Sequence, residues 1–294
     1  MKQSRKRKRR WLMLLTLLAS WHVLPIQAET VIPSEPVQTD QLQNQQQTTQ
    51  TRLGPVDGER LVFNLHWMGF PAGISIMKFK QPSDDSYDID VTLDSIGAVD
   101  FFFQVKDRLQ AKGRIVDNAL RSDYYLKSQK EDDLIRYAES KFDRTTNEVV
   151  FTERKNGKKS GKNRVVKDIP VNVNDPISSF YGLRLLKNLQ PQSTVKVPII
   201  DGGKWYNAEV RVGKAQRIYT PMGWFDAMPV YPQLKTSKLF RLKGQLIIWL
   251  TNDERRLPLR VEAQVKIGAV AIDLTEFQDG RGGSGKIVEE VEDR

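Results

Sequence analysis

The chain has 294 residues, of which 39% are hydrophobic and 28% charged, and it contains no cysteine. This composition is typical of a soluble globular protein, and without cysteine we expect no disulfide, thiol catalysis, thiolate metal site or lipidated N-terminus. The formal net charge is +10, but seven basic residues precede residue 11, and without them the 46 basic residues fall to 39, against 36 acidic ones. The basic excess is therefore confined to the start of the chain, and we expect no nucleic-acid partner.

A secretory signal peptide is predicted at residues 1–28. The basic stretch "MKQSRKRKRR" is followed by the apolar run "WLMLLTLLASWHVLPI" and by Ala28, a small residue of the kind that a signal peptidase recognises. Polar residues and a proline interrupt the apolar run, which makes it shorter than the roughly 20 residues that a membrane-spanning helix needs. Cleavage after Ala28 is therefore favoured over a membrane anchor. We expect a periplasmic protein that does not span the membrane.

The regions flanking the folded body are marked by their composition. Residues 29–57 include "QTDQLQNQQQTTQ", in which seven of thirteen residues are glutamine. Such a segment buries too little apolar surface to offset its ordering entropy, so we expect a disordered linker. The folded body is predicted to be a single β-rich domain at 58–280. The glycine-rich and then acidic residues 281–294 are predicted to be a flexible tail.

Within this body, polar and apolar residues alternate, which predicts β-strands with one face on a core and the other in water. The pattern is clear in "LVFNLHW" (61–67), "YDIDVTL" (87–93) and "LPLRVEAQVKI" (257–267), and short turn sequences separate such segments. The fold class predicted is mainly β: one large antiparallel twisted sheet curled into an open or closed barrel. A sandwich of two sheets is the alternative.

One short helix is predicted at about 175–186, in the sequence "NDPISSFYGLRLL". Asp175 is a suitable N-cap residue, and proline is favoured in the first turn that follows. A single amphipathic helix among strands must pack its apolar face on the sheet. We expect it to plug the concave side of the sheet or to cover one mouth, either as a part of the core or as a lid over a ligand.

The chain also resembles a known family over residues 58–280. The segments that carry the resemblance, in this order, are "GERLVFNLHW", "VKDRL", "KFDR", "DPISSFYGLR", "VPIIDGGKWY", "TPMGWFDAMPV" and "WLTNDERRLPLRVEAQVKIG". It is similar to the bacterial exported family catalogued as domain of unknown function 3108. The resemblance implies an exported β-rich domain without an established activity, and it supplies no catalytic residues to carry over.

Asp107 is the carboxylate of most interest. In "VKDRLQAKGRI" the apolar residues occupy alternate positions that should face the core, and Asp107 occupies one of these positions. A buried charge needs a partner, and Arg184 or Arg256 could supply one. In a structural interpretation the ion pair fixes the helix on the sheet. In a functional interpretation Asp107 is one half of a glycosidase-type carboxylate pair, with Asp253 as the second acid.

Aromatic residues gather near the predicted turns, and three phenylalanines stand together in "VDFFFQV". At least one of these three should be exposed, because they cannot all face one side of a strand. As residues that line a ligand site on the curved sheet we propose Trp67, Phe70, Phe102, Phe180, Tyr181, Trp205 and Trp224. The polar residues expected to be structural are Asp107, Asp175, Arg184, Asp253 and Arg256.

The sequence favours a protein without catalytic activity. After removal of the signal peptide a single histidine, His66, remains, so neither a His-based triad nor a two-His metal site can form within one chain. We assign no catalytic residue, metal or cofactor. The first hypothesis is a binding or envelope-assembly factor that holds a lipid or a polymer segment on a curved β surface. The alternatives are a carboxylate-dependent hydrolase of an envelope polysaccharide or peptidoglycan, and a structural protein-interaction module.

Overall fold

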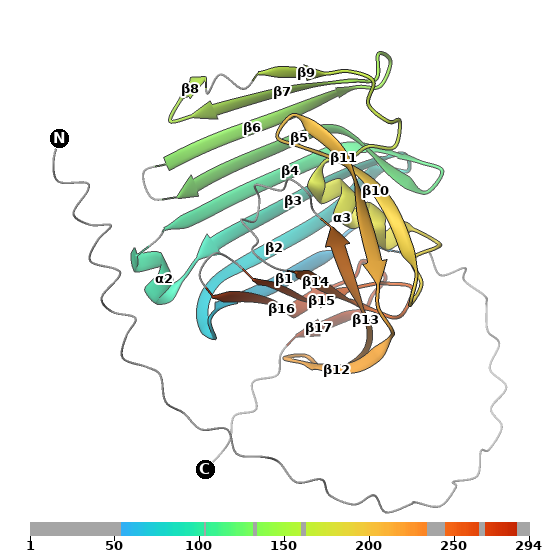
Figure 1. Cartoon of the computed structure of the whole chain (residues 1–294). Coiled ribbons are helices and arrows are strands. Elements are labelled where there is room, and N and C mark those ends of the chain that lie inside the picture. The colour runs from blue at the N-terminus through green and yellow to red at the C-terminus, as the bar shows by residue number, and fades with distance from the viewer. Residues whose placement is uncertain are drawn as a thin grey trace, which may run out of the picture. The chain divides into compact units, whose positions relative to one another are not determined.

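The alternating segments of the sequence form long antiparallel strands (Figure 1). The structure is a computed structural model that describes residues 54–102, 104–131, 134–159, 163–233, 245–264 and 268–286. The predicted signal peptide and the linker up to residue 53 lie outside the described residues. The same holds for the end of the predicted tail, residues 287–294.

The N-terminal half of the sheet is a meander in which each long strand pairs antiparallel with the next. Its seven long strands are β1 (Arg60–Trp67), β2 (Phe70–Ser83), β3 (Ser86–Ser95), β4 (Val105–Val116), β5 (Ala119–Glu131), β6 (Leu134–Asp143) and β7 (Glu148–Lys155). Two short strands pair with the outer side of β7, namely β8 (Lys158–Lys159) and β9 (Arg164–Val166).

The C-terminal half continues the same sheet from the other side of β1. Its strands are β10 (Thr194–Asp201), β11 (Lys204–Val212), β12 (Gln216–Thr220), β13 (Gly223–Gln233), β14 (Leu246–Thr251), β15 (Pro258–Gln264), β16 (Ala269–Gln278) and β17 (Ser284–Lys286). Pairing of β16 with β1 joins the two halves, and β11 pairs directly with β13. The long strands therefore lie in the order β10, β11, β13 to β16, and then β1 to β7.

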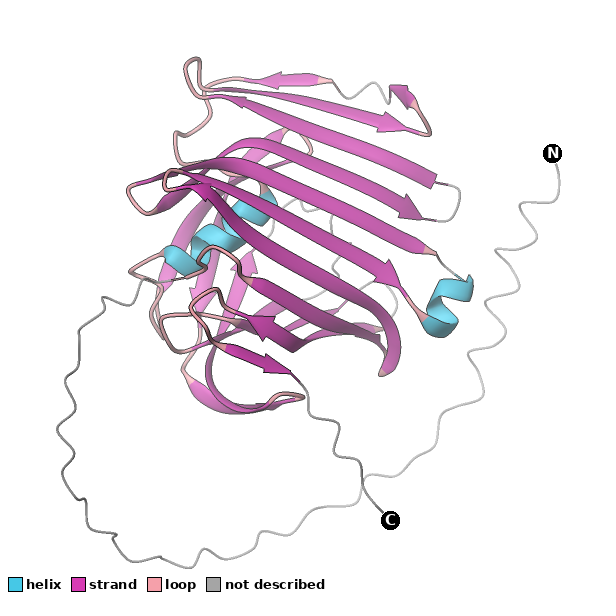
Figure 2. Ribbon diagram, turned by 180° about the vertical axis from the view of Figure 1, so that it is seen from behind, coloured by secondary structure: helices cyan, strands magenta, loops and turns pink. Residues whose placement is uncertain are grey.

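The sheet is strongly curled but it is not closed into a barrel (Figures 1 and 2). Twist of the strands and register shifts produce the curl. One shift between β4 and β5 lies at Lys112 and Gly113. A Cβ atom at Gly113 would lie 2.1 Å from the carbonyl oxygen of Arg121, so only glycine permits this close approach of the two strands. Of the predicted shapes, the open one is confirmed.

The predicted helix is present as α3 (Pro176–Leu185), and it lies on the concave side of the curled sheet (Figure 2). Asp175 is its N-cap: the carboxylate accepts hydrogen bonds from the backbone N–H groups of Ile177 and Ser178, each at 2.9 Å. Pro176 occupies the first turn, where the missing N–H is not needed. The predicted cap is therefore confirmed. The helix contacts β4, β5 and β10.

Three features differ from the sequence-based expectation. A short second helix, α2 (Gly97–Phe102), connects β3 to β4 in the segment that begins the "VDFFFQV" run. Strand β17 pairs with β16 inside the segment 281–294, which was expected to be a flexible tail. Gly54 and Pro55 are buried, so the ordered body begins before residue 58. None of the helices in the described part of the chain is long and apolar enough to cross a membrane.

Buried apolar side chains fill the curl around α3. Tyr181 is fully buried, and its ring stacks on Phe79 with 5.4 Å between the ring centroids. The hydroxyl of Tyr87 donates to Ser178 Oγ at 2.8 Å, which fixes the helix to β3. The end of the helix joins a second apolar cluster with β10, β11, β13 and β14. The core thus holds α3 against both halves of the sheet. Part of the space between the helix and the sheet is not filled by side chains.

Candidate ligand-binding site

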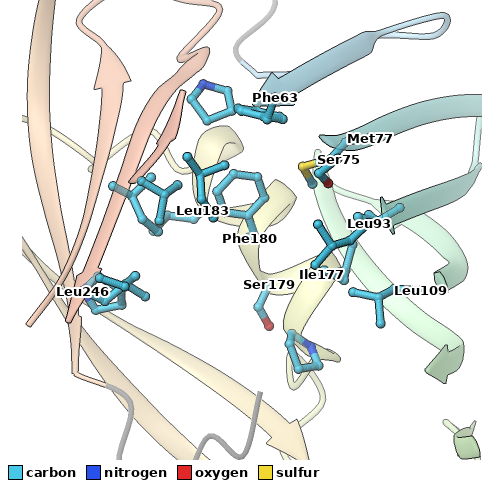
Figure 3. Close-up of a pocket in the computed structure, with 18 of the residues that line it drawn as sticks. Phe63, Ser75, Met77, Leu93, Leu109, Ile177, Ser179, Phe180, Leu183 and Leu246 are labelled. Atoms are coloured by element: carbon cyan, nitrogen blue, oxygen red, sulfur yellow. The ribbon is translucent and has the colours of Figure 1, made fainter. Parts of the chain in front are cut away.

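An apolar cavity of about 460 Å³ lies between the concave face of the sheet and α3 (Figure 3). Its walls are the inward-facing residues of β1 to β5, β10, β11 and β13 to β16, together with α3. Phe180 projects into it from the helix, between residues of β2 and β3 on one side and Leu246 on the other. Most of the lining residues are apolar. Besides Phe180 they include Phe63, Leu65, Met77, Val91, Leu93, Leu109, Ile177, Leu183, Val197, Ile199, Val210, Leu246, Ile248, Val261, Ala263, Val270 and Ile272.

The two-residue period of the strands explains why this cavity is apolar. On β3, Val91 and Leu93 face the cavity. Thr92 and Asp94, which alternate with them along the strand, face the opposite side of the sheet. The same alternation in the segments 61–67, 87–93 and 257–267 predicts an inward face, and six residues of that face line the cavity: Phe63, Leu65, Val91, Leu93, Val261 and Ala263. The alternation within the strands was therefore a signal in the sequence for which residues line the concave face.

Asp107 is one of two carboxylates that line the cavity. It faces inward, as its parity predicted, and it lies opposite Gln129 of β5, whose Nε2 donates to Asp107 Oδ2 at 2.8 Å. The other oxygen, Oδ1, is buried and has no hydrogen-bond partner among the described residues. Burial raises the pKa of Asp107 above its ordinary value, and the hydrogen bond from Gln129 opposes this effect only in part.

The predicted pairing of Asp107 with Arg184 or Arg256 is wrong. Arg184 binds Glu59 instead, through Nη1 to Oε1 at 2.7 Å and Nη2 to Oε2 at 2.6 Å. Glu59 immediately precedes β1 and shares the inward alternation of Leu61 and Phe63, so the pattern that selected Asp107 could also have selected Glu59. The physical reason for the error is that Asp107 meets a neutral amide on the adjacent strand, which partly satisfies it without an arginine.

Arg256 is buried, and it completes the C-terminal end of α3. Its guanidinium donates to the carbonyl oxygen of Arg184 in the last turn, where a helix leaves its carbonyls without helical partners, and to those of Leu186 and Leu189 just beyond the helix. Asp253 accepts hydrogen bonds from the backbone N–H of Arg256 and from the guanidinium of Arg255. The segment between β14 and β15 is therefore a clamp on the end of the helix.

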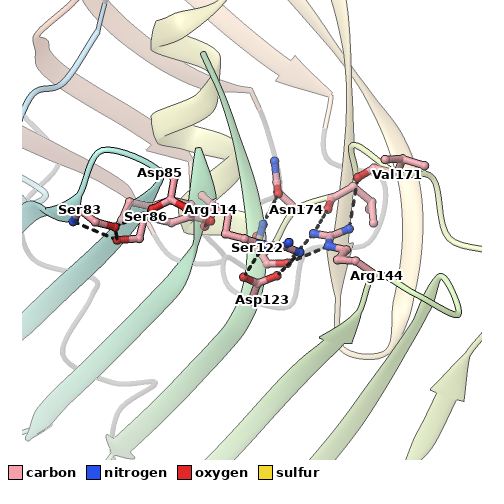
Figure 4. A network of polar contacts seen from close by, with 12 residues as sticks. Ser83, Asp85, Ser86, Arg114, Ser122, Asp123, Arg144, Val171 and Asn174 are labelled. Atoms are coloured by element: carbon pink, nitrogen blue, oxygen red, sulfur yellow. Dashed lines mark hydrogen bonds and ion pairs between the residues drawn. The ribbon is translucent and has the colours of Figure 1, made fainter. Parts of the chain in front are cut away.

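A network of polar contacts fixes the entry to α3 (Figure 4). The side chain of Asn174 bonds β5 through Ser122 and Leu120, and its backbone bonds β10 through Pro198 and Ile200. Asn174 therefore connects two strands that belong to different halves of the sheet. The network continues to Arg144 of the β6–β7 turn, whose guanidinium donates to three backbone carbonyls, those of Ser122, Val171 and Val173.

A second, charged cavity of about 390 Å³ adjoins the apolar one. It lies between the inner faces of β5, β6 and β7 and the turn that joins β10 to β11. Gln129 and Asp201 line both cavities, so the two spaces meet at these residues. The charged side chains around the second cavity are Lys127, Arg136, Glu153, Arg164, Asp201 and Lys204.

Of the six aromatic residues proposed for the ligand site whose side chains the structure describes, only Phe180 lines the apolar cavity. Tyr181 is buried in the core beneath it. Phe70, Trp205 and Trp224 are exposed at other places on the sheet, and Trp67 is half-buried at the end of β1. Phe102 ends α2, and its side chain lies outside what the structure describes. The walls are mostly aliphatic, because the strands place their alternating valines, leucines and isoleucines there.

The two carboxylates of the hydrolase hypothesis do not line one cavity. Asp107 faces the apolar cavity, whereas Asp253 lies in the clamp at the end of α3 and lines neither cavity. The carboxylate that shares the apolar cavity with Asp107 is Asp201, which the sequence had not singled out. A pair formed by Asp107 and Asp253 is therefore not supported by this arrangement.

Several solved structures are similar to this chain at low sequence identity and with TM-scores below 0.5. A β-barrel-like protein of the domain of unknown function DUF1849 from Brucella abortus has 13% identity and a TM-score of 0.49, with 77% of this chain and 98% of that chain covered. A DUF1089 family protein from Pseudomonas aeruginosa has 9% identity and a TM-score of 0.32, with 63% of this chain and 87% of that one covered. No curated protein sequence matches the chain significantly.

The family comparison agrees with the resemblance found in the sequence. The model of the family described as "Protein of unknown function (DUF3108)" matches residues 62–275, which extends from β1 to β16 and includes α3 and both cavities. The chain therefore belongs to the DUF3108 family.

Proposed function

We propose that this protein is an exported, non-enzymatic binding or assembly factor of the cell envelope that holds an amphipathic ligand in its apolar cavity. The observation that carries the proposal is the cavity itself: about 460 Å³ of space lined by aliphatic side chains and the helix α3. The basic and apolar leader at residues 1–28 supports export to the periplasm. The ligand could be a lipid or an apolar segment of an envelope polymer.

The size and lining of the cavity suit an acyl chain better than a polar substrate. Protein cores are normally packed to the density of organic crystals, and an unfilled apolar space of this size loses many dispersion contacts. The volume lies within the range of about 300–1,000 Å³ that is usual for small-molecule sites. Each methylene group transferred from water into such a site contributes about 0.8 kcal/mol. An alkyl chain would restore the missing contacts, and Asp107, Gln129 and Asp201 mark the polar end at which a head group would begin.

Native mass spectrometry of the protein purified from its own envelope tests the proposal directly. We expect an adduct with the mass of a lipid or of an amphipathic polymer fragment, which organic solvent removes. A protein that is always recovered without an adduct, and that does not increase the fluorescence of the apolar probe N-phenyl-1-naphthylamine, would contradict the proposal.

A pair of variants on β2 distinguishes cavity binding from binding elsewhere. Ser75 lines the cavity (Figure 3), and Ser75→Trp would place an indole in the space that the ligand needs. Ile74 is 37% exposed and lies on the opposite face of the same strand, so Ile74→Trp is the matched control. We expect loss of adduct and of probe fluorescence for Ser75→Trp only. Equal effects of the two variants would place the ligand outside the cavity.

A protein-interaction role is the second candidate, and one observation favours it. Phe101 on α2 is 86% exposed, and Phe70 on β2, the strand that α2 contacts, is 72% exposed. Exposed apolar side chains that gather on one surface are typical of a contact site. Cross-linking in intact envelopes, followed by purification of the wild type and of Phe101→Ser, tests this role. Capture of the same protein by the wild type and not by Phe101→Ser would support docking through α2.

A further inference from the structure

The charged cavity adjoins the apolar one at its polar end, and the two are lined in common by Gln129 and Asp201. A ligand longer than the apolar cavity would therefore extend between β5 and the turn that joins β10 to β11. Its polar end would then lie among charged side chains and its apolar end among aliphatic ones. This arrangement matches the two parts of a single amphiphile.

The charges around this second cavity favour an anion. Lys127, Arg136, Arg164 and Lys204 contribute four positive charges, and Glu153 and Asp201 contribute two negative ones. The side chain of Lys127 is only 11% exposed, yet its ion pair to Asp201 Oδ1 is 4.0 Å long and exceeds hydrogen-bond length. Within the described residues no hydrogen bond satisfies the ammonium group of Lys127.

The described residues thus supply no hydrogen-bond acceptor to an ammonium group that lines the charged cavity, and an anionic ligand in that cavity would supply one. The guanidinium group of Arg136, on the neighbouring strand β6, also has no hydrogen bond or ion pair in the described part of the chain. A planar guanidinium beside an ammonium is a common arrangement for binding phosphate or carboxylate oxygens. The two cations lie on the same wall, because β5 and β6 are adjacent.

The neighbouring acids do not make the site favourable for a cation. The negative charge of Asp201 is offset in part by the ammonium group of Lys127 beside it. Burial raises the pKa of Asp107, so that this carboxyl holds its negative charge less readily than an ordinary aspartate. Over the whole charged cavity four cationic side chains face two carboxylates, so its balance of charge is positive.

We propose that the ligand is an anionic amphiphile, with its phosphate or carboxylate head group bound by Lys127 and Arg136 in the charged cavity and its alkyl chain in the apolar cavity. This inference rests on the proposed function, because it assigns the head-group end of the same ligand. It does not depend on which envelope lipid or polymer supplies the amphiphile.

Isothermal titration calorimetry with three probes of equal chain length tests the inference. At constant ionic strength, we expect dodecyl phosphate to bind about tenfold more tightly than dodecanol, from charge-assisted hydrogen bonds to the head group. Dodecyltrimethylammonium should bind no more tightly than dodecanol. Inorganic phosphate alone should bind far more weakly than dodecyl phosphate, because it lacks the alkyl chain.

The variant Lys127→Met should remove most of the preference for phosphate and leave the affinity for dodecanol nearly unchanged. Lys130→Met is the matched control: it removes the same charge from the same strand, but Lys130 is exposed and lies on the outer face of β5. If Lys127→Met does not fold, as judged by its circular dichroism spectrum, Arg136→Met provides the same measurement from β6.

The outcomes separate this inference from the proposed function. Equal affinities for dodecyl phosphate and dodecanol, or a preference for the cationic probe, would overturn the anionic head group while leaving the apolar site intact. Inorganic phosphate that binds as tightly as dodecyl phosphate would show a site for a free anion and overturn the amphiphile. If none of the dodecyl probes binds, the proposed function and this inference both fail.

Discussion

Arg184 and Glu59 form a bidentate ion pair from which water is excluded. Their side chains are 0% and 1% exposed, and the two nitrogen–oxygen distances are 2.7 and 2.6 Å. Arg184 lies in the last turn of α3, and Glu59 lies immediately before β1. The pair thus joins the segment that enters the sheet to the helix on its concave side, and it closes the far end of α3 together with Arg256.

Removal of one partner of this pair should strongly destabilise the protein. In Glu59→Leu the guanidinium of Arg184 would be buried without its counter-charge, and we expect a loss of about 3–5 kcal/mol in the free energy of unfolding. Urea denaturation followed by circular dichroism measures this loss. The double variant Glu59→Leu/Arg184→Met should lose much less than the sum of the single variants, because it leaves no charge stranded.

A second double-mutant cycle, compared with the first, decides between Glu59 and Asp107 as the partner of Arg184. A double-mutant cycle on Asp107 and Arg184 should give additive losses, since these side chains share no hydrogen bond. Additive losses in the cycle on Glu59 and Arg184, or strong coupling in the cycle on Asp107 and Arg184, would contradict the observed pairing.

The cap of α3 should contribute more to stability than an exposed cap does. Asp175 is fully buried and accepts hydrogen bonds from two backbone N–H groups and from Ser122 Oγ. Asp175→Ala would leave these donors buried and unpaired, and we expect a loss of about 3 kcal/mol. Asp175→Asn retains an acceptor oxygen at the same place and should lose less than half as much. Equal losses in urea denaturation would show that the lost charge, and not the cap, is responsible.

Much of the fold could be predicted because its determinants are local. The alternation in "YDIDVTL" specifies which face of β3 is buried, and the sequence Asp175-Pro176 specifies where α3 begins. The pairing of β16 with β1 could not be predicted, because no local pattern shows which distant strand completes a sheet. The short helix α2 was also missed, since it has only six residues and lies in a run of β-favouring phenylalanines.

The site was predicted only in part, for a related reason. Parity placed Asp107 and the aliphatic wall residues on the concave face. It could not show that the nearest partner of Asp107 would be Gln129 on the adjacent strand, because that contact depends on the register between β4 and β5. The emphasis on aromatic residues also led away from the cavity, whose walls are built mainly from the ordinary valines, leucines and isoleucines of the strands.

Asp107 should make the stability of the protein depend on pH in a defined direction. Burial raises its pKa in the folded state above the ordinary value of 3.8, so the folded protein binds this proton more readily than the unfolded chain does. The resulting contribution to stability is complete below pH 3.8 and is lost as the pH rises through the folded-state pKa. Asn at this position does not titrate. Asp107→Asn should therefore become more stable relative to the wild type as the pH rises from 3.5 to about 7.

Urea denaturation of the wild type and Asp107→Asn at a series of pH values measures this difference. The comparison cancels the titration of the groups that the two proteins share. A difference in unfolding free energy that stays constant over the range, or one that changes in the opposite direction, would show that Asp107 is not held in an unfavourable charged state.

The affinity for neutral amphiphiles should increase with the length of the alkyl chain until the cavity is filled. Each buried methylene contributes about 0.8 kcal/mol, which corresponds to about a fourfold increase in affinity and about 15-fold for two carbons. Titration calorimetry with octanol, decanol and dodecanol measures this slope independently of any head-group charge. In Ser75→Trp the indole occupies part of the space, so the increase should stop at a shorter chain, whereas Ile74→Trp should follow the wild type. An affinity that does not change from octanol to dodecanol would mean that the alkyl chain remains in water.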